Sequence, residues 1–336
     1  MSVRDLLRGP RGGRVSSLLT VTNFLADSGS TVHVLANVEH QEHTDAGVLW
    51  SASPESHYDV VVFNRGIGDG LPDLEIKRRV LWVHDLPHSG FIPEPRMVRA
   101  LDCIVHMSDY SRWVWTKFYK HAAETKSVRI PNGVDQNLFH PLNAATKSAV
   151  CIYASAPNRG LERLPFIWES IDSRRSGFRC KAYSNLKALH PGEHEPSGEL
   201  EWFKSCEDAG IERLDPIPQH DLAQELRKAS LMLLPTDYPE ICSNAVLQSL
   251  ACGTPVITTG GIGATPEWVR HRKSGLLTET KPHDYMAYQV EFVRNAVSVL
   301  EDGRLHRKLV RGAASTYIHD WDEIGTKWLR LLKKLH

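Results

Sequence analysis

Strand patterns and helical patterns alternate along both halves of the chain. Apolar runs rich in β-branched and aromatic residues, or alternating with polar ones, predict strands at 31–36, 58–63, 79–84, 100–106, 149–153, 179–183, 231–234 and 254–258. Helical patterns occupy Val15–Ser28, which Gly29 closes, Leu222–Ala229 and Ala245–Cys252. The runs at 58–63 and 79–84 have the composition of buried strands. This alternation is typical of an α/β fold with parallel sheets.

The stretch 231–261, LMLLPTDYPEICSNAVLQSLACGTPVITTGG, is the part of the chain around which the rest is organised. Pro235 ends its apolar start, and a turn-rich segment then carries Glu240. Ser243 and Asn244 are residue types that favour helix N-caps, and Gly253 stands where a helix takes its left-handed C-terminal residue. The stretch predicts a strand, a loop, a helix and a second strand, with the helix N-terminus facing whatever the loop holds.

The start of this helix suits a phosphate or diphosphate. Its first turn leaves backbone N–H groups unpaired and carries roughly half a positive charge. A carboxylate at that place has sugar hydroxyls as its natural partners, which is the interpretation for Glu240. Gln248, one turn inside the helix, offers a donor and an acceptor to a ribose or a base. The local pattern is explained equally by an ordinary strand–helix–strand unit in which Glu240 is a solvated loop acid.

This stretch resembles the donor-site signature of the retaining glycosyltransferases of the GT-B fold, family 4. The family pattern is roughly P-E-G-F-G…E-A-M-A-C-G-T-P-V-I, with two glutamates separated by seven residues. Pro239 and Glu240 match its start, and the segment ACGTPVI at 251–257 matches its end. The chain departs from the pattern at Ile241, where the family has glycine, and at Gln248, where it has the second glutamate.

The resemblance implies a GT-B architecture, in which two Rossmann-like domains with parallel sheets face a cleft. Residues 1–142 are expected to form the N-terminal, acceptor-side domain, and residues 148–312 the C-terminal domain that binds a nucleotide-sugar. Residues 313–336 are expected to form a C-terminal helix that crosses back onto the first domain. The segment IPNGVD at 130–135 is similar to the family's N-G-V-D at the domain junction.

The resemblance also assigns donor-binding residues in the second half. The family carries G-R…K-G after the first strand of this domain, two cations that bind the donor diphosphate. Arg159 with Gly160 matches the second cation, and Ser155 stands nearest to the first. One arginine can hold two phosphate oxygens, so Arg159 can serve alone. A surface arginine at a helix start is the alternative, although a cation there opposes the helix dipole.

Further donor contacts are implied on either side of these residues. The segment DPIPQHDL at 215–222, which includes Ile217, resembles the family's segment whose backbone reads the nucleotide base, with Asp221 expected to cap the helix that follows. In the family a Gly-Gly turn closes over the donor phosphates or the acceptor. Gly13 is the donor-side candidate of this turn and Gly12 the acceptor-side candidate.

His84 and Asp85 are predicted to end a strand and face the acceptor. Ligands bind at this end of strands in open α/β sheets. His84 and His88 have the spacing of a helical zinc pair, but Pro87 between them disfavours that interpretation. The resemblance places His84 in contact with the transferred sugar and near the acceptor hydroxyl. A histidine satisfied by neighbouring backbone is the alternative.

Composition limits the function further. The 336 residues include 40 Lys and Arg and 40 Asp and Glu, so a general nucleic-acid binder, which needs a basic surface, is not expected. The six cysteines form no C-x-x-C pair and are typical of reduced thiols in a cytosolic protein. No apolar run approaches the ~18 residues of a membrane span, and the start of the chain is not a signal peptide. We therefore expect a cytoplasmic protein.

The segment 112–121, RWVWTKFYKH, mixes basic and aromatic residues and is predicted to form one helix. Such a face could lie on an anionic membrane surface beside a lipid-linked acceptor. A helix half in the core with its charged ends reaching water explains the pattern as well.

Taken together, these residues predict a retaining glycosyltransferase in which His84, Arg159 and Glu240 act in catalysis. The expected donor is a UDP- or GDP-sugar, the acceptor is a glycan, a lipid-linked or a small molecule, and no metal or other cofactor is expected. A non-catalytic sugar- or nucleotide-binding relative is the rival prediction, motivated by Gln248 and the missing first cation. A dinucleotide-dependent oxidoreductase would need a G-x-G-x-x-G after the first strand, which the sequence lacks.

Overall fold

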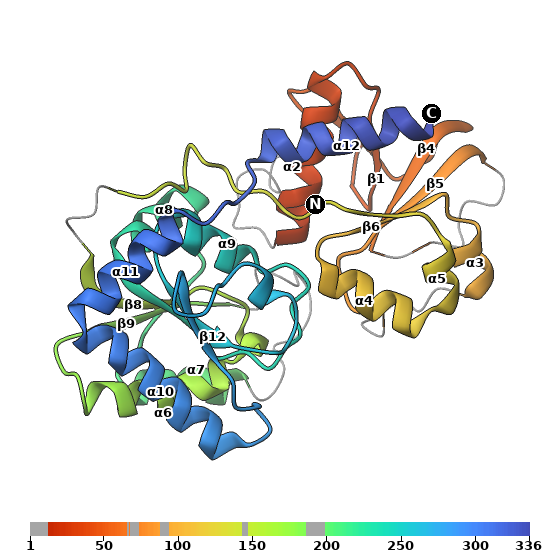
Figure 1. Cartoon of the computed structure of the whole chain (residues 1–336). Helices are drawn as coiled ribbons and strands as arrows, with labels where there is room; N and C mark the ends of the chain where they lie inside the picture. Colours follow the sequence, from red (N-terminus) through yellow and green to blue (C-terminus); the bar gives the residue numbers. More distant parts are fainter. Residues whose placement is uncertain (1–12, 66, 68–73, 88–93, 143–146, 186–198) are drawn as a thin grey trace. The chain divides into compact units, whose positions relative to one another are not determined.

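The chain folds as two compact units in the computed structural model, which describes residues 13–65, 67, 74–87, 94–142, 147–185 and 199–336. The first unit consists of Met1–Gly133 with His319–His336, and the second of Val134–Ile318. Each unit is built on parallel strands connected through helices, which confirms the predicted α/β fold with Rossmann-like domains (Figure 1). The domain limits expected at 142 and 312 stay predictions.

The first unit carries two sheets. Its elements in chain order are α2 (Gly13–Asp27), β1 (His33–Leu35), β2 (Glu42–His43), β3 (Leu49–Ser51), β4 (His57–Asn64), β5 (Glu75–Trp82), α3 (Pro95–Arg99), β6 (Cys103–His106), α4 (Asp109–Phe118), α5 (Lys120–Glu124), β7 (Ser127–Arg129) and α12 (Trp321–Leu335). The larger sheet is parallel with the order β4-β5-β6-β7. The smaller has the order β1-β3-β2, in which β2 runs antiparallel to β3.

The last helix of the chain packs into the core of this unit. The rings of Trp82 in β5 and Trp328 in α12 have centroids 4.8 Å apart, and both side chains are buried. Where α12 meets α2, a Cβ at Gly325 would overlap the ring of Phe24. The glycine therefore permits the close approach of the two helices.

Two sequence predictions for this unit are wrong in detail. The strand at 58–63 is not buried throughout, because β4 lies at the end of the sheet order and within it Phe63 alone is buried. The predicted helix 112–121 is broken between α4 and α5 at Tyr119, which has extended backbone angles. The Tyr119 hydroxyl donates to the Pro87 carbonyl at 3.2 Å, a contact made by a distant loop.

The second unit contains one six-stranded parallel sheet. Its elements are β8 (Ser148–Tyr153), the 3-10 turns η1 (Pro157–Arg159) and η2 (Leu161–Arg163), α6 (Leu164–Asp172), β9 (Arg179–Tyr183), α7 (Glu199–Asp208), β10 (Glu212–Leu214), α8 (Gln219–Lys228), β11 (Ala229–Leu234), α9 (Asn244–Ala251), β12 (Val256–Thr259), η3 (Thr265–Glu267), β13 (Gly275–Thr278), α10 (Tyr285–Glu301) and α11 (Gly303–Ala314).

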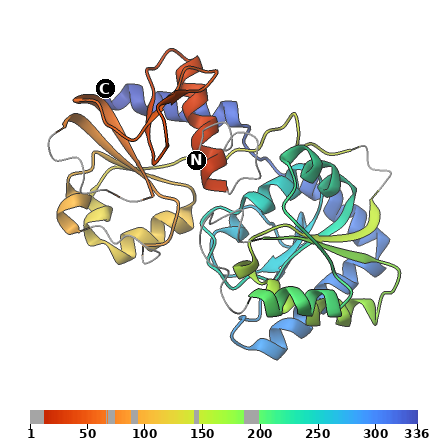
Figure 2. The same cartoon turned by 180° about the vertical axis from the view of Figure 1, so that it is seen from behind.

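The strand order of this sheet is β10-β9-β8-β11-β12-β13. Helices α6, α7 and α10 cover one face and α8, α9 and α11 the other (Figures 1 and 2). Every residue of β11 and β12 is buried as a result. This explains why β11 carries a continuous apolar run, LMLL at 231–234, rather than an alternating one.

The unit from β11 to β12 follows the sequence prediction closely. Ser243 is the N-cap residue of α9, and Gly253 has the expected left-handed conformation with φ of +67°. The prediction for Asp221 is wrong, because α8 begins at Gln219 with Pro218 as its N-cap. Asp221 lies in the first turn instead, where a carboxylate complements the helix dipole.

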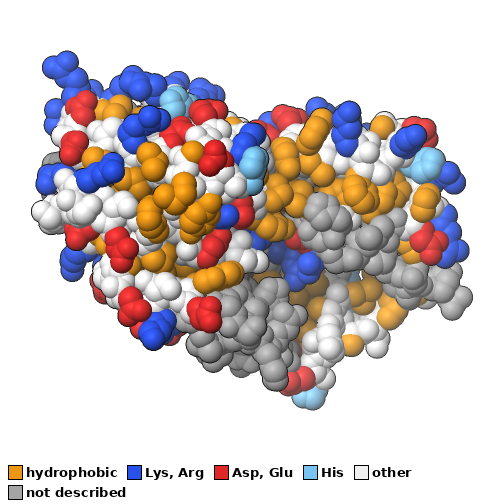
Figure 3. Space-filling view, turned by 90° about the horizontal axis from the view of Figure 1, so that it is seen from below, with side chains coloured by type: hydrophobic (Ala, Val, Ile, Leu, Met, Phe, Trp, Pro, Cys, Tyr) orange, Lys and Arg blue, Asp and Glu red, His pale blue; other side chains and the backbone are white. Residues whose placement is uncertain are grey.

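All six cysteines are free and buried, as expected for reduced thiols. The surface shown in Figure 3 carries Lys and Arg beside Asp and Glu, which agrees with a formal net charge of zero.

Candidate functional site

Polar side chains of the second unit gather where its central strands end. β8 leads into the turn with Arg159, and β11 leads into the loop with Tyr238 and Glu240. Because β8 and β11 are neighbouring parallel strands, these residues lie at one edge of the sheet. This is the edge at which open α/β sheets bind ligands.

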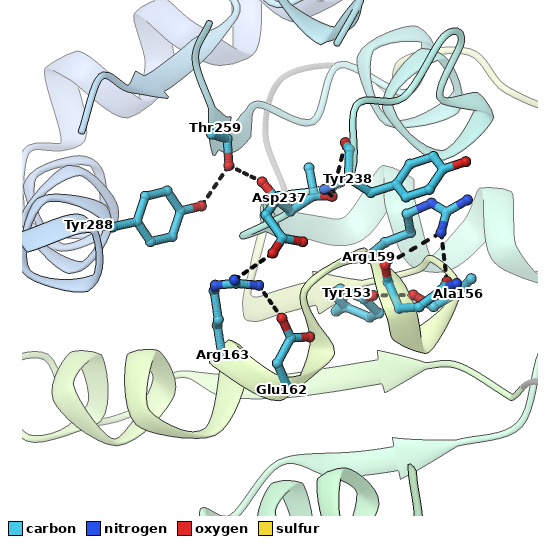
Figure 4. Close-up of polar contacts among 11 residues, drawn as sticks. Tyr153, Ala156, Arg159, Glu162, Arg163, Asp237, Tyr238, Thr259 and Tyr288 are labelled. Atoms are coloured by element: carbon cyan, nitrogen blue, oxygen red, sulfur yellow. Dashed lines mark hydrogen bonds and ion pairs between the residues drawn. The ribbon is translucent and has the colours of Figure 1, made fainter. Parts of the chain in front are cut away.

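Arg159 and Glu240 form an ion pair, with 2.7 Å between Nε and Oε1 and side chains only 18% and 16% exposed. The Arg159 guanidinium also lies over the Tyr238 ring, with Cζ 3.4 Å from its centroid (Figure 4). Its Nη1 donates to Asn158 Oδ1 at 2.7 Å. Among the described residues nothing accepts from Nη2, which therefore keeps N–H groups that can donate to a ligand.

The backbone of the Glu240 loop is held by a glycine that the sequence analysis did not single out. Gly263 has φ of +66°, and a Cβ there would lie 2.6 Å from the Glu240 carbonyl oxygen. The next residue, Ala264, donates its N–H to the same carbonyl at 2.6 Å. The segment G-I-G after β12 was the only sequence signal for this contact. Glu240 is thus fixed from β12 as well as by Arg159.

A second arginine, Arg163, also supports this loop. Arg163 is buried, contacts Glu162, and donates through Nη2 to Asp237 Oδ2 at 2.7 Å (Figure 4). Burial raises the pKa of Glu162, against the opposing effect of Arg163. Sequence reasoning missed Arg163, because only the fold brings it to a residue 74 positions away.

A hydroxyl pair anchors the start of the loop. The Thr259 hydroxyl contacts the Thr236 carbonyl and lies 2.7 Å from the Tyr288 hydroxyl, with all three residues buried (Figure 4). The loop from Thr236 to Glu240 is therefore fixed at both ends.

The start of α9 lacks the features that usually satisfy a helix N-terminus. Ser243 makes no side-chain capping bond, and the first turn contains no acidic residue. The anion-binding role that the sequence predicts for this helix start stays a prediction. Half-buried Asn244 is the first residue of the helix.

Gln248 has a partner that the sequence did not indicate. Its side-chain Nε2 donates to Oε1 of Gln219, the first residue of α8, at 2.6 Å. This bond fixes the amide so that Gln248 Oε1 is left to accept from a ligand.

Ser155 and Ile217 lie at the carboxyl ends of β8 and β10 and are half-buried. The Ser155 carbonyl accepts from the Ser184 hydroxyl at 2.7 Å, which ties the ends of β8 and β9 together. Their roles in donor binding stay predictions, as do those of the other site residues.

In the first unit, His84 and Asp85 follow the end of β5. Asp85 pairs with Arg65, with 2.5 Å between Oδ2 and Nε, and its carbonyl accepts from Trp115 Nε1 at 3.1 Å. The His84 ring lies 4.5 Å from that of Trp82. Burial lowers the pKa of His84 to about 3, and the charges of Arg14 and Arg65 act in the same direction.

His84 Nε2 is buried and has no hydrogen-bond partner among the described residues. The alternative of a histidine satisfied by neighbouring backbone therefore finds no support at this nitrogen. A neutral, unpartnered imidazole nitrogen at the carboxyl end of a strand is suited to a hydroxyl ligand.

The glycine turn predicted before this unit is only partly described. Gly12 lies outside the described residues, as does His88. Gly13 is the first residue of α2, and its carbonyl accepts from the Ser17 hydroxyl at 2.7 Å.

The described residues contain neither a candidate membrane span nor a candidate metal cluster. Of the helices that the structure describes, none has the length and apolar character needed to cross a membrane. Within the same residues, His, Cys, Asp and Glu side chains do not gather in threes that could hold a metal ion. The expectation of a metal-independent reaction stays a prediction.

Part of the chain is similar to a known protein family. Residues 177–295 match the family model described as "Glycosyl transferases group 1". The chain is 26% identical over 260 residues to a D-inositol 3-phosphate glycosyltransferase of Acidothermus cellulolyticus, covering 70% of this chain and 55% of the relative. It is 21% identical over 243 residues to an exopolysaccharide phosphotransferase of Streptomyces coelicolor, covering 71% and 25%. The chain therefore spans about half and a quarter of these relatives.

Solved structures resemble the chain over almost its full length. A sucrose-phosphate synthase from Thermosynechococcus elongatus aligns with a TM-score of 0.77 and 16% identity, covering 99% of this chain and 97% of the other. WaaG, a glycosyltransferase involved in lipopolysaccharide biosynthesis, aligns with a TM-score of 0.71 and 15% identity, covering 96% and 97%. At such identities the likeness establishes the GT-B fold. The chain thus has the GT-B fold, and its residues 177–295 are similar to the group 1 glycosyl transferases.

Proposed function

We propose that this protein moves a sugar from a nucleotide-diphospho-sugar to a hydroxyl group of an acceptor, with retention at the anomeric carbon and without a metal. The observation that carries the proposal is the Arg159 guanidinium at the carboxyl end of the sheet, held by Glu240, Asn158 and Tyr238, with Nη2 left without an acceptor among the described residues. The family match of residues 177–295 includes Glu240 and the helix that follows it.

The donor diphosphate would lie between Arg159 and the first turn of α9. Arg159 would offer N–H groups to phosphate oxygens, and the start of α9, where the N-cap Ser243 makes no side-chain capping bond, would offer the positive end of the helix dipole. Both are positioned before the reaction begins, so they would stabilise the negative charge that develops on the leaving diphosphate.

Glu240 would hold hydroxyls of the transferred sugar. Oε1 is engaged by Arg159, and each carboxylate oxygen can accept more than one hydrogen bond. Gln248, with its amide fixed by Gln219, would accept from the ribose. UDP- and GDP-sugars are the donors we expect.

In the transfer step, the acceptor hydroxyl oxygen forms a bond to the anomeric carbon while the bond from that carbon to the diphosphate oxygen breaks. The hydroxyl proton passes to an oxygen of the leaving phosphate. Attack from the face that the diphosphate leaves retains the anomeric configuration. His84 would contact the sugar near the acceptor hydroxyl as a neutral ring, which agrees with the lowered pKa of its imidazole.

Thermal stability of the purified full chain against UDP-, GDP- and ADP-sugars and the free nucleotides tests the donor site. A ligand that binds only the folded state at a hundredfold excess over Kd stabilises by about 2.7 kcal/mol. One base should raise the melting temperature equally with and without EDTA, and the Arg159→Ala variant should lose the shift. No shift with any nucleotide would contradict the proposal.

Gln248 motivates the second candidate, a non-catalytic relative that binds nucleotide or sugar. An amide in place of the family's carboxylate offers the ribose a neutral acceptor, which is the weaker kind. The two candidates differ in turnover. The enzyme releases nucleotide from its donor in the presence of an acceptor, whereas the binding relative shows only the thermal shift.

Contact with a membrane surface is a separate part of the proposal, together with a cytoplasmic location suggested by the free thiols. Trp113 and Phe118 of α4 are 55% and 52% exposed, beside the exposed Arg112 and Lys117. Exposed aromatic and basic residues on one helix favour an anionic bilayer surface. Co-sedimentation with anionic but not neutral vesicles, lost on the double change W113S and F118S, would support it, and equal sedimentation with both vesicle types would contradict it.

A further inference from the structure

We propose that the acceptor carries an oxyanion, a phosphate or a carboxylate, which Arg14 and Arg65 bind beside His84 in the first unit. This inference deepens the proposed function and rests on it, because it names the chemical class of the acceptor.

The three residues come from separate elements that meet at one edge of the four-stranded sheet. Arg65 follows β4 and His84 follows β5, and these strands are neighbouring and parallel. Arg14 is the second residue of α2. The first turn of α2 reaches the same edge, since Ser17 Oγ lies 3.0 Å from Oδ1 of Asn132, which follows β7.

Arg65 is held in an unusual backbone conformation. Its φ is +87°, in a region that residues other than glycine seldom occupy. Its N–H donates to the Trp82 carbonyl at 3.1 Å, and its side-chain Nε contacts Asp85. Backbone strain of this kind is found where a side chain must be held for function. Here it presents a guanidinium next to His84.

Charge around His84 is not balanced by the described residues. Asp85 pairs with Arg65. Burial and the charge of Arg65 lower the pKa of Arg14, and the charge of Asp85 acts against this shift. Arg14 makes no hydrogen bond or ion pair to any described residue. Both guanidinium groups act electrostatically on His84, whose Nε2 lacks a partner among those residues. Among the described residues, two cations stand against one anion. An oxyanion on the acceptor would be the counter-charge to this positive surplus.

The surplus is separate from the cation assigned to the donor. Arg159 belongs to the second unit, where it is paired with Glu240. A neutral acceptor would need only hydroxyl partners such as His84 and Asp85. Two arginines at that place are more than a neutral sugar requires, and arginine is the side chain whose geometry fits phosphate and carboxylate oxygens.

Inorganic phosphate is the first probe. Thermal unfolding of the full chain is measured in potassium phosphate and in potassium chloride of equal ionic strength, for the wild type, Arg14→Gln, Arg159→Gln and Arg96→Gln. Arg14 is exposed and unpaired among the described residues, so R14Q is expected to fold. Arg96 is an exposed arginine of the same unit and serves as the matched control. We expect phosphate to stabilise the wild type and R96Q, and R14Q to raise the apparent Kd roughly tenfold or more.

An Asp85→Asn variant should change the affinity for phosphate in the direction opposite to R14Q. Removing the carboxylate releases Arg65 and increases the positive surplus, so phosphate should bind more tightly than to the wild type. An equal shift in the wild type and R14Q would overturn the proposal. A shift that R159Q alone abolishes would overturn it as well, because phosphate would then bind only in the second unit.

Failure of the proposed function gives a different pattern. If no nucleotide binds but the phosphate shift still depends on Arg14, the anion site stands and the glycosyltransferase proposal fails. If nucleotides bind in an Arg159-dependent way while phosphate ignores Arg14, the acceptor is not anionic and the proposed function stands.

Two further probes distinguish a soluble oxyanion from a lipid-borne one. One is glucose 6-phosphate compared with glucose, and the other is phosphatidylcholine vesicles with and without phosphatidic acid. Binding that R14Q weakens in either comparison supports the proposal and identifies a soluble or a lipid-borne phosphate. Binding that R14Q leaves unchanged in both would overturn it.

Discussion

Arg159 Nε and Glu240 Oε1 lie 2.7 Å apart, although 81 positions separate the two residues in the sequence. The pair joins the turn after β8 to the loop after β11. A cation proposed for the diphosphate and an anion proposed for the sugar thus orient each other before any ligand binds. A substitution of either residue should therefore weaken the ligand contact proposed for the other.

The first prediction concerns the coupling of this pair. Arg159→Ala should weaken binding of the nucleotide diphosphate by roughly ten- to a hundredfold, since hydrogen bonds to charged groups contribute about 1.5 to 3 kcal/mol. Glu240→Ala should weaken it too, because Arg159 loses the partner that orients it. The double variant should be less impaired than the sum of the two effects. Isothermal titration with UDP or GDP measures all three.

Arg175→Ala is the matched control for this cycle, since Arg175 is an exposed arginine of the same unit that lies over the Phe178 ring. It should bind nucleotide as the wild type does. Strictly additive losses for Arg159 and Glu240 would contradict the coupling.

A second prediction concerns Gly263, which approaches Glu240 from the segment after β12. Gly263→Ala should lower the free energy of unfolding by about 1 to 3 kcal/mol through its positive φ, and should also displace Glu240, because the added Cβ meets backbone atoms of that residue. Nucleotide-sugar affinity should therefore fall. Chemical denaturation and titration with the donor measure the two effects.

The variant Gly177→Ala distinguishes the effect of backbone strain from the effect of a Cβ contact with Glu240. Gly177 has φ of +91° and no atom within 4 Å of an added Cβ, so this variant introduces positive-φ strain alone. It should lose stability without losing donor affinity. Equal donor affinity in the two variants would show that Gly263 does not position Glu240.

Local sequence signals predicted the elements of this site but not the contacts between them. The helix α9 was predicted from Ser243 and Gly253, because caps and left-handed glycines act within a few residues of the helix end. The bond from Gln248 to Gln219 and the pairing of Arg163 with Asp237 join residues 29 and 74 positions apart. Such pairs depend on strand order, which a single sequence does not encode locally.

Errors in the elements have the same origin. Residues 112–121 have a continuous helical pattern, and the break at Tyr119 accompanies a hydrogen bond to Pro87, 32 positions earlier. Residues 58–63 have the composition of a buried strand, yet β4 lies at the end of its sheet, where one side of a strand is left uncovered. In both cases tertiary context overrides the local preference.

The third prediction concerns acid sensitivity. Burial lowers the pKa of His84 to about 3 and of His106 to about 4, from an ordinary value of 6.5. Between those values the unfolded chain binds a proton that the folded chain does not. The free energy of unfolding should thus fall as the pH drops below 6.5, by about 1.4 kcal/mol per pH unit for each histidine.

Urea denaturation at pH 7 and pH 5 measures this loss. His84→Gln should reduce the difference between the two pH values, because glutamine does not titrate. His40→Gln, a change at an exposed position, is the control and should behave as the wild type. The same pH dependence in all three proteins would contradict the prediction for His84.

The last prediction concerns the amide at position 248. Gln248→Glu should bind the nucleotide about threefold to tenfold more tightly, because ribose hydroxyls donate more strongly to a carboxylate than to an amide. Gln219 can turn its amide and donate Nε2–H to the new carboxylate, so a new hydrogen bond replaces the present one at 2.6 Å.

Two further variants test the same contact. Gln248→Ala should bind the nucleotide more weakly than the wild type. The affinity of Gln219→Ala should lie between the two, since it removes the partner of Gln248 but leaves the acceptor. Titration of the four proteins with the free nucleotide, which lacks the sugar, isolates this contact from the sugar contacts proposed for Glu240. If Gln248→Glu binds less tightly than the wild type, the position does not face ribose hydroxyls, and the neutral amide pair serves the fold instead of the donor.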